Sequence, residues 1–201
     1  MPAMKKAQKT KRPITTPDRI LDVAERLMQT RGYNGFSYAD VAAEIGISKA
    51  TLHHHFATKA ALGAELIVRY SARVGATLSS IDSGEVEATE QLARYAQLYA
   101  DVLSQDRLCL CGMLAAEYST LPQPMQKTIR QFFVNNHRWL ASVIARGRTA
   151  GSLFPRSTDQ SAALMLLGGL EGAMLIARPM KDIDGFYASA RQLLALLQRP
   201  G

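Results

Sequence analysis

Apolar residues recur at intervals of three and four along almost the whole chain, and this spacing restricts its fold more than any other feature. The clearest case follows Pro17, where one face of a helix collects five apolar residues: Ile20, Val23, Ala24, Leu27 and Met28. No stretch of useful length alternates apolar with polar residues as a strand does, and we find no internal repeat or low-complexity insert. The pattern therefore predicts an all-α protein.

Capping residues mark the first two helices. Thr16 as the N-cap, Pro17 at the first helical position and Gly32 after the end predict the first helix. Ser37 is followed three residues later by an aspartate, which is the spacing of a capping box, and Gly46 ends the short helix that follows.

The later helices are separated by polar residues, glycine and proline. Ser48 caps a third helix that ends near Phe56, and Thr58 caps a fourth that runs from residue 59 to about residue 80. The remaining helices are predicted at about 85–104, 108–119, 122–149, 158–178 and 184–198. Long helices joined by short connections predict a bundle.

The composition places the chain among ordinary globular proteins. Its 201 residues are 47% apolar and 20% charged, and no stretch is expected to span a bilayer. The basic segment 1–12 lacks the apolar stretch of a secretory signal. With only Cys109 and Cys111, the chain has no disulfide framework. We therefore expect a cytoplasmic protein without a membrane partner.

Positive charge gathers at the N-terminal end. The net charge is +7, and residues 1–59 hold ten Lys or Arg against five Asp or Glu, whereas the remainder holds fourteen against twelve. An excess of this kind is typical of a surface that binds phosphates. A solvated basic tail would give the same excess, so charge alone does not identify a nucleic-acid partner.

The segment 36–56 has the pattern of a helix-turn-helix. This motif needs a small residue where its helices cross, a residue that tolerates left-handed geometry in the turn, and an apolar anchor on the second helix. Ala42, Gly46 and Leu52 meet these needs. If Leu52 and Phe56 are buried, the opposite face presents Lys49, Ala50, His53 and His54 to a major groove.

The neighbouring residues make the resemblance more specific. The series Gly32-Tyr33, Phe36-Ser37, Val41-Ala42, Gly46 to Leu52, His55-Phe56 and Thr58-Lys59 resembles the TetR family signature across residues 16–66. The resemblance implies that DNA is contacted by Ser37, Lys49, Ala50, Thr51, His53, His54, His55 and Lys59. The family usually has tyrosine where this chain has His53.

The resemblance also implies the domain organisation and the function. A basic flexible tail (1–15) precedes the helix-turn-helix domain (16–60) and a domain for effector binding and dimerisation (61–201). Such a protein is a transcriptional repressor that binds a palindromic double-stranded operator as a homodimer, uses no cofactor, and is released by an unknown small molecule. Small residues in 158–178 and leucines in 185–198 fit an intersubunit four-helix bundle, although they fit an intrachain core as well.

Two features suggest where an effector is sensed. The spacing of Cys109 and Glu117 resembles the NemR-like, electrophile-sensing branch of that family, in which the corresponding cysteine responds to reactive species. A reactive thiol needs a lowered pKa and exposure, and free cysteines are more often buried apolar residues. Residues suited to an apolar pocket, together with Cys109 and Cys111, are Tyr95, Tyr99, Met113, Phe132, Phe133, Trp139 and Met165, although aromatic residues at helical spacing are more often core.

Other functions have less support. The adjacent His53, His54 and His55 point about 100° apart on a helix, so they do not form a metal site. No nucleophile with a neighbouring base, no glycine-rich phosphate loop and no paired carboxylates suggest an enzyme. An architectural DNA-binding protein is the stronger alternative, since it too would be basic and helical.

Overall fold

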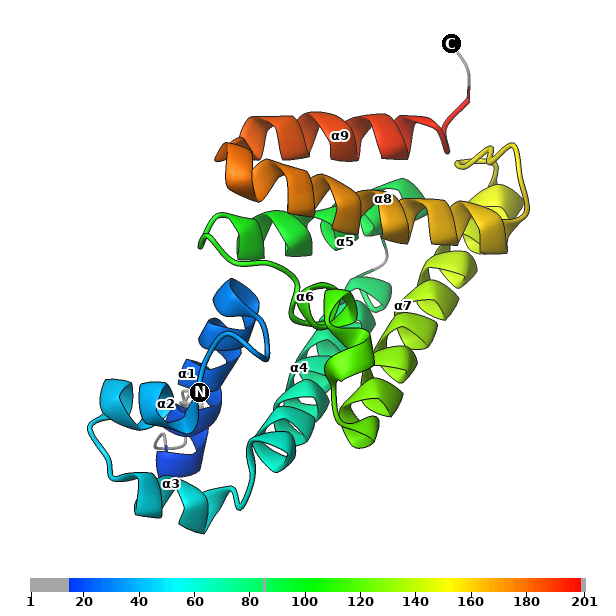
Figure 1. Ribbon diagram of the computed structural model, residues 1–201. Helices are drawn as coiled ribbons and strands as arrows, with labels where there is room; N and C mark the ends of the chain where they lie inside the picture. The colour runs from blue at the N-terminus through cyan, green and yellow to red at the C-terminus, as the bar shows by residue number, and fades with distance from the viewer. Residues whose placement is uncertain (1–14, 85, 200–201) are drawn as a thin grey trace, which may run out of the picture.

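The computed structural model describes residues 15–84 and 86–199, and within these ranges it contains helices and no strand (Figure 1). The all-α prediction is confirmed. The predicted basic tail lies almost entirely in residues 1–14, outside the described residues. The elements are α1 (Thr16–Arg31), α2 (Tyr38–Ile45), α3 (Lys49–His55), α4 (Lys59–Asp82), α5 (Ala88–Leu103), α6 (Leu110–Ala116), a 3₁₀ turn (Tyr118–Thr120), α7 (Gln123–Ala150), α8 (Asp159–Met180) and α9 (Ile183–Ala195).

Local capping explains the ends of the first three helices. The N-cap of α1 is Thr15 and not Thr16, because the capping box is closed with Asp18, three residues after Thr15. The predicted capping box of α2 is present, and Gly46 ends that helix in the left-handed region at φ 75°. The Oγ of Ser48 accepts the backbone amide of Thr51, so Ser48 is the N-cap of α3, as the sequence predicted.

The long helix α4 joins the two parts of the molecule. It begins directly after α3 and crosses the boundary predicted near residue 60. Its first half buries Leu62 and Leu66, and α4 packs against α1 as well as against α7 (Figure 1).

Helix α6 is shorter than the helix predicted over 108–119. It is preceded by Cys109 as the N-cap and ends at Ala116, with Glu117 as the C-cap, after which the chain makes a 3₁₀ turn. Helix α6 contacts α1, α4 and α7, so it lies between the N-terminal helices and the bundle (Figure 1).

Helix α8 has one packed face and one free face. It packs against α7 and α9, and at Gly169 a Cβ would lie 2.7 Å from the side chain of Leu193 on α9. At Gly168 and Gly172 a Cβ would meet only open space. Leu164 and Ile176 are 62% and 63% exposed, and the other exposed apolar residues of this free face are Met165, Leu175 and Met180.

From the sequence we expected no stretch long and apolar enough to span a bilayer, and for α8 this expectation was wrong. This helix is long and apolar enough to cross a membrane by length and composition, with a mean hydropathy of 1.4. Composition is weak evidence, because the core helix of a globular protein meets the same criterion. Here α8 lies against α7 and α9 in the bundle.

Candidate functional site

Helix α3 presents its polar side chains on the surface at one end of the molecule, far from α8 and α9 (Figure 1). Leu52 is completely buried and fixes the orientation of the helix. The exposed residues are Lys49, Ala50, Thr51, His53, His54 and His55. The major groove of DNA is wide enough to admit an α-helix, so α3 can enter it with this exposed face toward the bases.

Two of the predicted contact residues take part in helix capping: Ser37 is the N-cap of α2, and Thr51 donates its amide to Ser48, the N-cap of α3. The hydroxyl of Ser37 donates to Asp40 at 2.7 Å and accepts the amide of the same residue. The hydroxyls of Thr51 and Ser48 lie 2.9 Å apart. Both predicted residues are exposed, so these caps fix the hydroxyl groups at the surface.

Tyr38, which the sequence analysis did not single out, supports His53. The two rings meet edge to face with 4.8 Å between centroids, and the Nδ1 of His53 lies 3.2 Å from the carbonyl oxygen of Ala57. The Tyr38 hydroxyl donates to the carbonyl of Phe56 at 2.8 Å. Burial, with a smaller effect of Tyr33, raises the pKa of Tyr38 to about 12, so this donor stays protonated.

Lys59 lies differently from the other predicted DNA contacts. Its ammonium group is 4.5 Å and 4.2 Å from the ring centroids of Tyr33 and Phe36, and it donates to the carbonyls of the same two residues. Burial lowers the pKa of Lys59, while Glu117 and Asp40 oppose that shift. In this position Lys59 ties the loop before α2 to the start of α4, whereas the sequence suggested a phosphate contact.

We expect Lys59→Met to lower the free energy of unfolding by about 1–3 kcal/mol, because it removes two charge-assisted hydrogen bonds and the cation–π contacts. Urea unfolding measures this change. Lys49→Met is the matched control, since Lys49 is exposed and is expected to leave stability unchanged. Unchanged stability of Lys59→Met, combined with weaker DNA binding, would instead support a phosphate contact.

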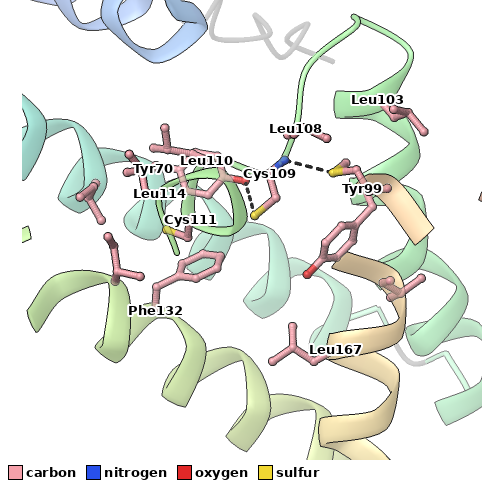
Figure 2. Close-up of a cluster of buried hydrophobic side chains, with 14 of the residues drawn as sticks. Tyr70, Tyr99, Leu103, Leu108, Cys109, Leu110, Cys111, Leu114, Phe132 and Leu167 are labelled. Carbon is pink, nitrogen blue, oxygen red and sulfur yellow. Dashed lines mark hydrogen bonds between the residues drawn. The ribbon is translucent and has the colours of Figure 1, made fainter. Parts of the chain in front are cut away.

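A small cavity lies among α4, α5, α7 and α8, with a volume of about 30 Å³, room for about one water molecule. We call it the tyrosine cavity. Figure 2 shows Tyr70, Tyr99, Cys109 and Phe132 in this region. The lining residues are Tyr70, Val74, Tyr95, Leu98, Tyr99, Val102, Cys109, Phe132, Asn136 and Met174.

The cavity contains part of the predicted effector set. Tyr95, Tyr99, Phe132 and Cys109 are among its lining residues, whereas Cys111 and Met113 pack elsewhere in or against the core. Trp139 stacks on Tyr95 with 5.5 Å between ring centroids, and its indole N–H donates to Asp82 at 2.8 Å. Trp139 therefore supports the cavity from outside.

Three polar or polarizable residues of the tyrosine cavity were not predicted from the sequence: Asn136, Met174 and Tyr70. The Tyr95 hydroxyl donates to Oδ1 of Asn136 at 3.1 Å and lies 3.1 Å from the Tyr99 hydroxyl. The Sδ of Met174 accepts the backbone amide of Cys109 at 3.1 Å (Figure 2). Tyr70, the third, comes from α4 and had no sequence signal that placed it near α6.

The environment of Cys109 does not favour a thiolate. Cys109 is 4% exposed, and the Tyr70 hydroxyl donates to its sulfur at 3.7 Å (Figure 2). Burial, followed by the nearby Glu171, raises the pKa of Cys109 well above its usual value. Burial also raises the pKa of the fully buried Cys111. Neither cysteine has the low pKa and exposure that a reactive thiol needs.

Glu171 places a carboxyl group between the tyrosine cavity and the surface. The Tyr99 hydroxyl donates to its Oε1 at 3.3 Å. A Cβ at Gly112 would clash with its Oε2, so the absence of a side chain there lets the carboxyl group lie against α6. Burial raises the pKa of Glu171 to about 7, although hydrogen bonds from Cys109 and Tyr99 act in the opposite direction.

A larger groove of about 560 Å³ lies among α6, α7 and α8, and Glu171 forms part of its wall. We call it the α6–α8 groove. Its lining residues are Gly112, Ala115, Ala116, Phe133, Val134, His137, Leu164, Leu167, Gly168, Glu171 and Leu175. Phe133 thus lies in this groove and not in the tyrosine cavity, and Met165 lies in neither lining.

The other end of α6 contacts the helix-turn-helix region. The carboxylate of Glu117 accepts the backbone amides of Tyr33 at 2.6 Å and Asn34 at 3.4 Å. At Gly32, with φ 78°, a Cβ would lie 2.6 Å from the same carboxylate. Helix α6 therefore contacts Glu171 near its start and the loop before α2 at its end.

Within 15–84 and 86–199, no group of three His, Cys, Asp or Glu side chains is arranged to hold a metal ion. His54 and His55 have ring centroids 5.4 Å apart, and His53 is turned toward Tyr38.

Comparisons with known proteins agree with this geometry. Residues 20–66 match the family described as "Bacterial regulatory proteins, tetR family". A TetR family transcriptional regulator from Agrobacterium tumefaciens is 31% identical, with a TM-score of 0.88 over 91% of this chain and 97% of that one. The repressor DhaR of Mycobacterium sp. (strain GP1) is 24% identical over 83% of this chain and 86% of its own. Reduced NemR of E. coli has a similar fold, with 23% identity and a TM-score of 0.81 over 92% of this chain and 98% of that one.

Proposed function

Because this chain belongs to the TetR family of DNA-binding transcriptional regulators, we propose that it is a repressor that binds a palindromic operator as a homodimer and releases it when a small molecule binds. The relatives and the fold are those of regulators and not of enzymes. The observation that carries the proposal is the exposed polar face of α3 behind the buried Leu52. We propose that the protein acts in the cytoplasm, where operator DNA is found.

In this proposal α3 enters the major groove, with Lys49, Ala50 and Thr51 near base edges. His53, His54 and His55 lie farther along the helix and contact edges or phosphates. Ser37 contacts the backbone from the start of α2. Lys59 donates to carbonyls of its own domain. We therefore propose that Lys59 holds the loop before α2 in position and does not contact DNA directly.

Lys49→Ala is expected to reduce the ratio of operator affinity to random-DNA affinity by about tenfold, because a good contact with a base edge is worth about 1–3 kcal/mol. Binding titrations on both DNAs at several salt concentrations measure the ratio. Lys127→Ala removes the same charge from the exposed surface of α7, and we expect it to leave the ratio unchanged. Equal loss on operator and random DNA in Lys49→Ala would mean that Lys49 contacts only phosphate.

The free face of α8 supports the dimer. Its exposed leucine and isoleucine side chains flank Gly168 and Gly172, where a second helix has room to approach closely. Gly169 is occupied by the intrachain contact with α9. The sequence left two alternatives for the small residues of this helix, an intrachain core and an intersubunit contact. We assign Gly169 to the core, and Gly168 and Gly172 to the proposed dimer contact.

We propose that the effector binds without a covalent bond and acts through α6. The buried, protonated Cys109 gives an electrophile-sensing role little support. A ligand that displaced the carboxyl group of Glu171 would change its contact with Gly112 at the start of α6, while Glu117 holds the loop before α2 at its end. A packed helix with contacts at both ends transmits such a displacement to α2 and α3.

A further inference from the structure

We propose that the α6–α8 groove binds an organic cation, a primary or quaternary ammonium group on an apolar body, with the positive group at the carboxylate of Glu171. This ligand would be the effector, and its effect on DNA release rests on the proposed function. The ligand-binding part stands on the geometry of the groove.

The carboxylate of Glu171 has no counter-charge among the described residues of the groove. Glu171 is the only acidic residue in the lining of the groove, and within 15–84 and 86–199 the ion pairs of the structure do not include it. Its polar contacts are neutral donors: the Tyr99 hydroxyl at 3.3 Å and the Cys109 thiol. A carboxylate in apolar surroundings is costly without a counter-charge, and a bound cation supplies one.

The groove around Glu171 has the size and the apolar lining of a small-molecule site. Its volume of about 560 Å³ lies in the range of small-molecule sites, whereas the tyrosine cavity of about 30 Å³ is too small for anything beyond a water molecule. Apart from Glu171 and His137 the lining consists of glycine and apolar residues, with Phe133 as its aromatic side chain. An apolar body fits this lining, and an anionic ligand would be repelled by Glu171.

Helix α6 approaches Glu171 closely. Because Gly112 has no side chain, the carboxyl group of Glu171 lies directly against the helix while remaining part of the groove wall. A cation that draws the carboxyl group toward the groove therefore moves it away from Gly112. This is the contact through which ligand binding would reach α6.

The ionisation of Glu171 supports the assignment and predicts its pH dependence. Since burial raises the pKa of Glu171 to about 7, a cation is expected to bind more tightly at pH 8 than at pH 6. The titratable groups that face Glu171 are Tyr70 from α4, Tyr99 and Tyr95 from α5, Cys109 before α6 and Cys111 in α6. All five stay protonated in this range because their pKa values are raised. His137 on α7 lines the same groove, and His137→Gln separates its contribution.

The test uses three probes with the same body and different charge: 4-phenylbutylamine, 4-phenylbutanol and 4-phenylbutyrate. Isothermal titration calorimetry at pH 8 with the full-length protein is expected to show the amine binding at least about tenfold more tightly than the alcohol, with the carboxylate weakest. Glu171→Gln keeps the shape of the side chain and is expected to remove the preference for the amine. Glu90→Gln, which removes a carboxylate from the exposed pair with Arg94, is expected to retain it.

Two results would overturn the assignment: equal affinity for the amine and the alcohol in the wild-type protein, or an amine preference that survives in Glu171→Gln. Leu164, Gly168 and Leu175 belong both to this lining and to the free face of α8 proposed for the dimer, so the groove borders the dimer contact. If a second copy of the chain fills the groove, no probe will bind the dimer, which also overturns the assignment. Operator binding by the ligand-free protein is measured separately. A Glu171-dependent amine preference without release of DNA would leave the site in place and refute its regulatory role, whereas failure to bind any DNA would refute the proposed function alone.

Discussion

Replacement of both Leu164 and Ile176 by glutamate is expected to convert the protein into a monomer and to weaken binding to a palindromic operator by at least about 100-fold. The two side chains are 62% and 63% exposed on the free face of α8, so the single chain loses little by the change. In a dimer the same change would bury charges in an apolar contact, which costs several kcal/mol. Linking two DNA-binding units raises affinity by about 10²–10⁴, and the monomer forfeits that gain. Sedimentation equilibrium and operator titrations measure both effects.

The control for this variant is Val68→Glu. Val68 is 51% exposed on α4, away from α8, and its replacement makes the same change from apolar to charged. We expect this variant to sediment like the wild type. A double variant on α8 that remained dimeric would exclude the free face of α8 as the contact between copies.

The second large effect concerns Glu171 and pH. Its pKa is near 4.5 in the unfolded chain and about 7 in the folded protein, so the folded state keeps a proton that the unfolded state loses. The free energy of unfolding should therefore fall as pH rises from about 4.5 to 7 and then level off, with a total loss of about 3 kcal/mol from this group. In Glu171→Gln this loss should disappear, which makes the variant more stable than the wild type at pH 8.

Urea unfolding of both proteins between pH 4.5 and pH 8 measures the difference, in which the contributions of all other titrating groups cancel. Glu90→Gln serves again as the control, and we expect its stability to follow that of the wild type at each pH. Parallel curves for Glu171→Gln and the wild type would mean that the Glu171 carboxyl group is solvated in the folded protein.

The sequence predicted the helices and the helix-turn-helix because their signals are local. A cap and its amide lie three residues apart, as in the Ser37 capping box, and Leu52 fixes the face of α3 by periodicity alone. The one-residue error at Thr15 arose because two adjacent threonines both suit an N-cap and only the aspartate at position 18 decides between them. The end of α6 was missed because Glu117 serves amides of a loop 83 and 84 residues earlier.

The parts of the site that the sequence did not predict depend on contacts between distant residues. The phosphate contact of Lys59 stays a prediction, but its hydrogen bonds to the carbonyls of Phe36 and Tyr33, 23 and 26 residues earlier, were not predicted, because no local pattern relates residues so far apart. No sequence pattern singled out Glu171, which is one charged residue in an apolar helix. Its burial depends on Tyr99, 72 residues earlier, and on the space at Gly112. Aromatic residues at helical spacing identified three lining residues of the tyrosine cavity, Tyr95, Tyr99 and Phe132, but did not distinguish the lining from the support that Trp139 gives.

The continuity of α4 has a mechanical consequence. The helix runs over 24 residues, Lys59–Asp82, and is therefore about 36 Å long at about 1.5 Å per residue. Its first turn follows α3 after a short connection of residues 56–58, so a rotation of α4 moves α3 with it. A tilt of about 5° around the distant end would displace the near end by about 3 Å. Successive base pairs are about 3.4 Å apart, so a rotation this small suffices to carry α3 almost one base-pair step out of register.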